Sequence, residues 1–233
     1  MKIDKLSSIL TLIATCSFSQ LSVAAELDIE ITNLTQGLHF TPLLVAAHGE
    51  ADHMYQLGMA ASDELQLMAE GGDISGLSGL LTSADKAENP AAGLLAPGMS
   101  TLTMLSTDAA NTRLSIVSML LPTNDGFVGL DSWTIPTEAG TYTIYLNGYD
   151  AGTEANDEII NGGGAPGAPG IPADPSGNNG TGATGVTDME MTQVVHVHRG
   201  ALGDTDASGG SSDLNSTVHR WLNPVAKVTV TVK

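Results

Sequence analysis

Two acidic loops contain residue types that could bind a divalent cation. Asn124-Asp125-Gly126 lies between two stretches with strand character, and Asp150-Ala151-Gly152-Thr153-Glu154 directly follows another. Calcium takes roughly six to eight oxygen ligands, which carboxylates and backbone carbonyls in loops can supply. Two such loops at one end of a β-domain could meet around one ion, although Asn-Asp-Gly is also a common turn without any ligand role.

A second kind of metal chemistry is suggested by His196 and His198, which are separated by one residue. Within a strand such residues lie on one face, so both imidazoles could bind zinc or copper with a third ligand. His219 or His48 could supply that ligand from elsewhere in the chain. The alternative is an exposed polar face on a strand whose other face carries valines.

A third acidic segment, Asp204-Thr205-Asp206, lies in a stretch rich in Gly, Ser and Asp. It could form another calcium loop, but its composition favours a solvated turn. The chain has no Gly-x-Ser-x-Gly elbow, no His-Glu-x-x-His pair and no Gly-x-x-x-x-Gly-Lys loop. We therefore expect a binding module rather than an enzyme.

The charge of the chain limits its partners. The 233 residues include 26 acidic and 8 basic side chains, which gives a formal net charge of −18. Such a surface repels nucleic acid and anionic lipid and attracts cations. We expect no nucleic-acid partner.

The N-terminus predicts export. Two lysines within residues 1–5 precede an uncharged apolar stretch at 6–18, and small residues near 22–25 suit cleavage after Ala24. We assign 1–24 as a signal peptide and expect a periplasmic, extracellular or cell-surface protein. The apolar stretch is too short to span a membrane, and no later segment is long enough. Cys16, the only cysteine, leaves with this peptide or marks a faint lipoprotein site.

The mature chain, residues 25–233, predicts one all-β domain. A helical insertion is expected around residues 62–87, where Ser62 can cap a helix and the short stretch 84–87 also looks helical. A Gly/Pro-rich stretch, flexible at about 155–185, should be a surface loop that buries little. Antiparallel strands in a two-sheet β-sandwich fit this pattern, with Trp133 and Trp221 in the core. The expected extended segments are residues 27–34, 40–47, 53–59, 100–105, 113–120, 127–130, 140–147, 189–199 and 225–232.

Several segments together resemble the spondin domain. Residues 113–130 combine an apolar strand, a Pro-x-x-Asp turn that ends at Asp125, and Val128-Gly129-Leu130. Residues 149–154, Tyr-Asp-Ala-Gly-Thr-Glu, resemble the aromatic-Asp-Ala-Gly-Thr-acidic segment of that family. The opening strands at 29–47 and the last strand at 224–230 also look like those of bacterial members. The resemblance covers about residues 27–233.

This resemblance implies a C2-like sandwich, one bound Ca²⁺ and an adhesive or matrix role outside the cell. Carried over position by position, the calcium ligands would be Asp125, Asp150 and Glu154. Glu154 stands where animal domains have Asp, the cysteines of those domains are absent, and the insertion after Glu158 differs. The sequence thus predicts a secreted calcium-binding module that contacts an extracellular protein or glycan. The alternative is a periplasmic transition-metal protein that uses His196 and His198.

Overall fold

The computed structural model describes residues 24–233. The proposed signal peptide, apart from Ala24, and Cys16 lie outside this range. Within it, none of the helices combines the length and the apolar character that a membrane crossing requires.

The described chain is mostly β, and ten strands form one sheet in the order β4-β3-β6-β7-β8-β10-β1-β5, with β2 paired to β6 and β9 to β8. All of these pairings are antiparallel. In chain order the elements are β1 (Glu26–Asn33), β2 (His39–Phe40), β3 (Leu44–His48), α1 (Asp63–Gly71), α2 (Ser75–Leu80), β4 (Asp85–Glu88), β5 (Ser100–Ser106), β6 (Arg113–Leu121), β7 (Gly126–Thr134), β8 (Gly140–Asp150), β9 (His196–Val197) and β10 (Ala226–Val232).

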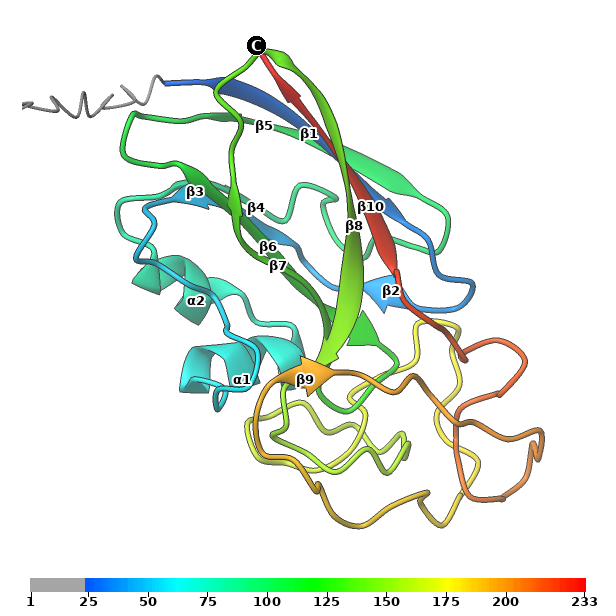
Figure 1. Ribbon diagram of the computed structural model, residues 1–233. Coiled ribbons are helices and arrows are strands. Elements are labelled where there is room, and N and C mark those ends of the chain that lie inside the picture. Colours follow the sequence, from blue (N-terminus) through cyan, green and yellow to red (C-terminus); the bar gives the residue numbers. More distant parts are fainter. Residues whose placement is uncertain (1–23) are drawn as a thin grey trace, which may run out of the picture.

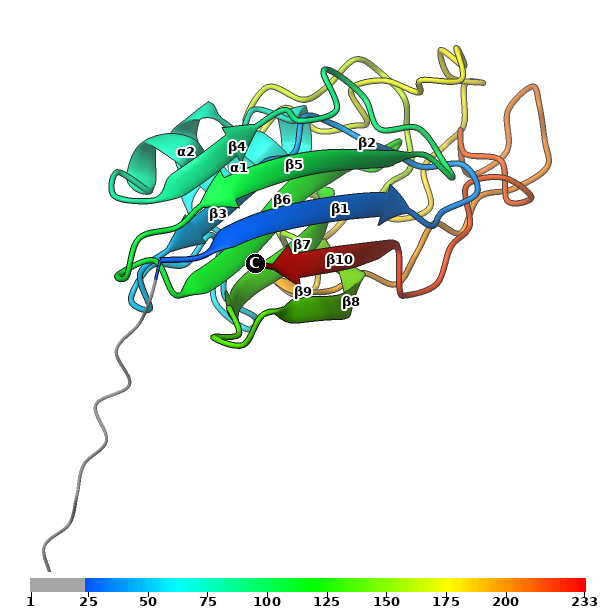
Figure 2. The same ribbon diagram turned by 90° about the horizontal axis from the view of Figure 1, so that it is seen from above.

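Strand β8 joins the two layers that the sequence predicted as separate sheets. Its first part, from Gly140 to Leu146, pairs with β10, and its last part, from Asn147 to Asp150, pairs with β7. The result is one continuous antiparallel sheet that is nearly closed into a barrel-like shape (Figures 1 and 2). The mostly antiparallel β prediction is confirmed, whereas the division into two sheets is corrected by the shared strand.

Buried and more exposed residues alternate along β1 and β10, and their buried residues line the interior of the curved sheet. In β1, Leu27, Ile29 and Ile31 are buried while the acidic residues between them are less so. Ile29 pairs with Val230 of β10, whose valines are also buried. Apolar side chains from both layers therefore meet inside the curved sheet, where their burial is the main favourable term in folding.

Strands β3 and β6 are buried on both faces because the two helices cover their outer side (Figure 1). Ser62 is the N-cap of helix α1, and its Oγ accepts a hydrogen bond from the Leu65 amide at 3.1 Å. Leu65 and Met68 then pack in the same cluster as Phe127 of β7. This cover explains why β6 is buried at nearly every residue and not only at every second one.

Three local predictions are wrong. Residues 53–59 form turns and irregular chain, and 84–87 belong mostly to β4 and not to a helix. Pairing of β4 with β3 overrides the weak helical preference there. Of residues 189–199 only His196–Val197 is strand, because the Val195 amide bonds the Met59 carbonyl (2.8 Å) outside any ladder.

The long Gly/Pro-rich loop buries more than the sequence suggested. Ile160 and Ile171 pack with Ala201 and Leu214 in a small separate cluster. The two long loops, before and after β9, gather at the end of the sheet where β8 ends (Figure 1). This end of the molecule holds the acidic segments.

A close approach between β8 and Trp221 gives a test of the fold. A Cβ on Gly148 would lie 2.5 Å from Trp221 Cη2, and the indole is buried. We expect Gly148→Ala to lower the free energy of unfolding by about 1–3 kcal/mol through overpacking. Gly79→Ala, in α2 with open space around it, should leave stability unchanged or raise it. Denaturant unfolding followed by tryptophan fluorescence measures both, and an unchanged Gly148→Ala midpoint would contradict this packing.

Candidate functional site

Pairing between β7 and β8 brings the two acidic loops together. Gly126 is the register partner of Asp150, and the Ala151 amide donates to the Asp125 carbonyl at 3.2 Å. Asp125 is the last residue before β7 and Asp150 is the last residue of β8. The antiparallel register therefore brings the two residues to the same end of the sheet, where burial and the charge of Asp150 raise the pKa of Asp125.

Asp125 is fully buried, and only one of its two carboxylate oxygens accepts hydrogen bonds in the described chain. Its Oδ2 accepts hydrogen bonds from the backbone amides of Thr153 (2.8 Å) and Glu154 (3.2 Å). Its Oδ1 has no hydrogen-bond partner among residues 24–233. Burial, together with the neighbouring charge of Asp150, raises the pKa of Asp125 to about 8. An ionised Asp125 therefore lacks compensating charge.

Asp150 is equally enclosed. Its Oδ1 accepts from the Gly152 amide (2.8 Å) and its Oδ2 from Asn156 Nδ2 (2.7 Å). Burial raises the pKa of Asp150, although the Asn156 hydrogen bond opposes the shift. Two adjacent buried carboxylates are costly unless a proton or a cation lies between them.

Glu154, the third carried-over ligand, points elsewhere. Its Oε2 accepts from the Gly170 amide at 3.0 Å, and its Oε1 is buried without a partner in the described chain. Burial raises the pKa of Glu154 to about 7, with further contributions from Glu70 and Asp157. The structure thus brings Asp125 and Asp150 together and turns the Glu154 carboxylate toward the Gly/Pro-rich loop.

The second acidic loop requires glycine at position 152, because residues 192–194 approach its backbone closely. Gly152 has φ +71°, and a Cβ there would lie 2.7 Å from both the Thr192 carbonyl oxygen and the Val194 amide nitrogen. The Asp150 turn is therefore packed directly beneath the segment that leads into β9. This contact links the acid pair to the two histidines.

Hydrogen bonds fix the tautomers of both histidines, because backbone amides only donate and backbone carbonyls only accept. His196 Nδ1 lies 2.8 Å from the Val194 carbonyl and must carry a proton, so its Nε2 holds the lone pair in the neutral ring. His198 Nδ1 accepts from the Gly200 amide at 2.9 Å, so the proton is on its Nε2. Burial lowers the pKa of His198 to about 3, which keeps this ring neutral.

These tautomers separate the roles of the two rings. Both Nε2 atoms face Asp150 Oδ2, at 3.7 Å from His196 and 4.0 Å from His198. Only His196 offers a lone pair there, so the predicted two-histidine chelate would require the Gly200 hydrogen bond to break. Within residues 24–233, no group of three or more His, Cys, Asp or Glu side chains is arranged to hold a metal ion.

Sequence reasoning missed the residues that support this site. Asn124 Nδ2 donates to Asp157 (2.8 Å), and its Oδ1 accepts from the Glu158 amide (3.2 Å). Glu158, buried at φ +60°, accepts from the amides of Leu202 (2.6 Å) and Gly203 (2.8 Å). Its carboxylate thereby connects the two long loops. No local pattern marks such residues, since their partners come from distant loops.

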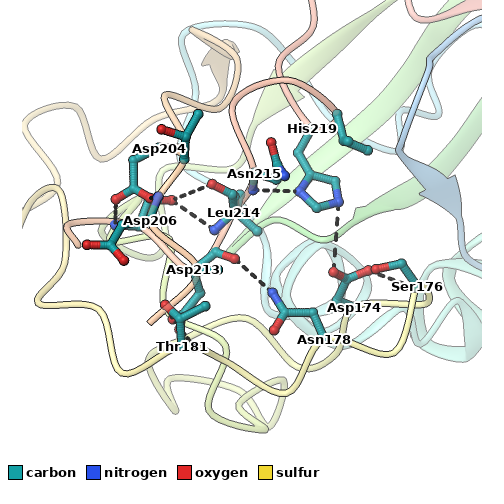
Figure 3. A pocket seen from close by; sticks show the side chains of 14 residues that line it. Asp174, Ser176, Asn178, Thr181, Asp204, Asp206, Asp213, Leu214, Asn215 and His219 are labelled. Atoms are coloured by element: carbon teal, nitrogen blue, oxygen red, sulfur yellow. Dashed lines mark hydrogen bonds and ion pairs between the residues drawn. The ribbon is translucent and has the colours of Figure 1, made fainter. Parts of the chain in front are cut away.

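A cavity of about 410 Å³, lined mostly by polar residues, lies among the long loops (Figure 3). Two carboxylates there are occupied by backbone amides. Asp204 Oδ2 accepts from Ser211 and Ser212, and Asp213 Oδ1 accepts from Thr181. These bonds lower the pKa of Asp204, and in Asp213 they outweigh the opposing effect of burial. Asp204 thus supports the turn interpretation of residues 204–206.

Both ring nitrogens of His219, the histidine that lines this cavity, face polar partners within the protein. His219 Nδ1 accepts from the Asn215 amide at 3.0 Å, so its Nε2 carries the proton and faces Asp174 Oδ2 at 3.8 Å (Figure 3). Neither nitrogen of the neutral ring offers a lone pair to a metal. His219 is therefore a poor third ligand for the site near β9.

One buried Ser–His contact resembles part of a catalytic triad. His48 Nε2 lies 2.7 Å from Ser115 Oγ, while its Nδ1 lies 2.8 Å from the Gly49 carbonyl. Both residues are completely buried. A substrate could not reach this serine, so the pair supports packing of β3 against β6 and not nucleophilic catalysis.

Comparison with known proteins agrees with the sequence pattern. No curated protein matches the chain significantly. The Spondin_N family model matches residues 32–159, which is more than half of the chain and contains Asp125, Asp150 and Glu154. Domains of this type are generally non-catalytic modules. The chain belongs to the Spondin_N family.

Proposed function

We propose that this protein is an exported, calcium-binding spondin module that mediates adhesion to an extracellular protein or glycan. The observation that carries the calcium proposal is the buried pair Asp125 and Asp150. One oxygen of this pair has no hydrogen-bond partner in the described chain, and both carboxyl pKa values are raised. A divalent cation would supply the missing charge and the missing contact.

The residues present fit such an ion in part. Asp125 and Asp150 would provide two carboxylates, and calcium readily adds neutral oxygens from side-chain amides and backbone carbonyls. Glu154 would join only if its side chain turned away from Gly170. A bound ion would hold the β7 and β8 ends and the segment above Gly152 as one unit.

The adhesive role rests on family membership and charge. Export is inferred from residues 1–24, and the acidic surface disfavours nucleic acid and anionic lipid as partners. A module with loops gathered at one end presents them as a contact surface, as in other β-domains. The partner class, an extracellular protein or glycan, is inferred by analogy with the family.

A transition-metal function for the histidines is the second candidate. Its support is the lone pair of His196 Nε2, directed toward Asp150 at 3.7 Å. If His196 and His198 act as a chelating pair, His198→Gln should abolish micromolar zinc or copper(II) binding. The tautomer of His198 predicts instead that this variant changes stability but not the affinity for these metals.

Thermal unfolding with and without calcium tests the leading proposal. At about 100 times its dissociation constant, calcium stabilises the folded state by about 2.7 kcal/mol, which corresponds to a rise of several degrees in Tm for a chain of this size. Asp125→Asn and Asp150→Asn should abolish the rise, and magnesium should not reproduce it. Glu154→Gln should retain most of it.

Asp206→Asn, which removes the same charge from an exposed turn, is the matched control and should respond like the wild type. An equal calcium shift in Asp150→Asn and in the wild type would reject the assigned site.

The pH dependence of the calcium-free protein follows from the raised pKa values. Asp125 titrates near 3.8 when unfolded and about 8 when folded. Between these values the folded state holds the extra proton, so stability falls as pH rises. In chelator, Tm should be higher at pH 5 than at pH 8, and Asp125→Asn should reduce this difference. If Asp125→Asn and the Asp206→Asn control kept the same slope, Asp125 would not be the titrating group.

A further inference from the structure

A separate cavity of about 210 Å³ opens beside the acid pair, and two methionines line it. Met189 and Met191 contribute to its wall together with His196, Glu190 and Asp150. Met189 is 58% exposed and Met191 is 80% exposed, so solvent can reach both side chains. What sets them apart from the other exposed methionines is their place beside a histidine in one cavity wall.

Hydrogen bonds position the methionine segment against the rest of the molecule. Thr187 Oγ1 donates to the Met189 carbonyl at 3.2 Å. Glu190 accepts from the Thr192 amide at 3.0 Å and from Asn156 Nδ2 at 3.4 Å. Asn156 is the same residue that donates to Asp150. The two thioethers are therefore carried by a segment that is tied to the rim of the cavity.

His196 supplies a third soft or borderline ligand in the same wall. Its Nδ1 proton is engaged by the Val194 carbonyl, which leaves the Nε2 lone pair on the side of Asp150, another lining residue. A carbonyl on the opposite nitrogen is also the usual arrangement that orients a metal-binding imidazole. Thioether sulfur and imidazole nitrogen together favour copper(I) over hard cations.

We propose that Met189, Met191 and His196 form a binding site for copper(I). The ligands are neutral, and the charged groups in the same wall are the carboxylates of Asp150 and Glu190 and the guanidinium of Arg199. Two negative charges against one positive charge leave the wall favourable to a cation. Cys16 is the only cysteine of the chain and lies outside residues 24–233, so no thiolate of the described domain competes for the metal. This site takes its three ligands from outside the calcium proposal, and Glu190 still offsets the charge of copper(I) when Asp150 binds calcium.

Competition for copper(I) tests the proposal. The protein without residues 1–24 would be titrated with copper(I) under ascorbate against the chromophoric chelator bicinchoninate. We expect one copper(I) per chain in the wild type. Met189→Leu with Met191→Leu should weaken the affinity at least about tenfold, since loss of even an outer-shell partner of a metal site costs about that much. His196→Gln should weaken it as well.

The matched control is Met99→Leu with Met104→Leu. These two methionines are 57% and 70% exposed but do not line the cavity, so their replacement should leave the affinity unchanged. Circular dichroism and an unchanged Tm show that each variant retains its fold. Failure of the wild type to compete for copper(I), wild-type affinity in Met189→Leu with Met191→Leu, or an equal loss in the control would each overturn the proposal.

Discussion

Two carboxylates that the sheet forces together are the constraint on which the functional end of this protein depends. The register of β7 with β8 brings Asp125 and Asp150 to the same end of the sheet, where both are buried and where this burial and the charge of Asp150 raise the pKa of Asp125. A proton or a cation at this pair would relieve the repulsion between the two charges. The surrounding amides of Thr153, Glu154 and Gly152 offset only part of the charge.

The rest of the architecture keeps this end of the sheet fixed. Strand β8 belongs to both layers, so the core of β1 and β10 and the helix-covered core of β3 and β6 both restrain its last residues. Glycines permit the close contacts that this requires, as at Gly148 beneath Trp221 and at Gly152 beneath residues 192–194.

Residues with local periodicity were predictable from the sequence, and residues with distant partners were not. Alternation located β1, β5, β8 and β10 to within a few residues, and Ser62 marked the start of α1. Asp125 and Asp150 could be predicted as partners in one site from the spondin-like motifs. The short β4 was mistaken for a helix because its pairing with β3 is a tertiary effect.

Within the site, spacing alone did not predict where the Glu154 carboxylate points or which tautomers the two histidines adopt. Glu154 has the correct position in the motif, but its longer side chain reaches Gly170 in an insertion that the sequence could not place. His196 and His198 have strand spacing, yet hydrogen bonds to Val194 and Gly200 give them opposite tautomers. The roles of Asn124, Asn156 and Glu158 depend on loop contacts that no local pattern encodes.

The most direct test of the account is calorimetric titration of calcium into the protein without residues 1–24, compared with its Asp125→Asn variant. The acid pair predicts one calcium per chain in the wild type and no binding heat in the variant. Wild-type stoichiometry and affinity in Asp125→Asn, or no binding heat in either protein, would contradict the claim that a cation completes the buried pair.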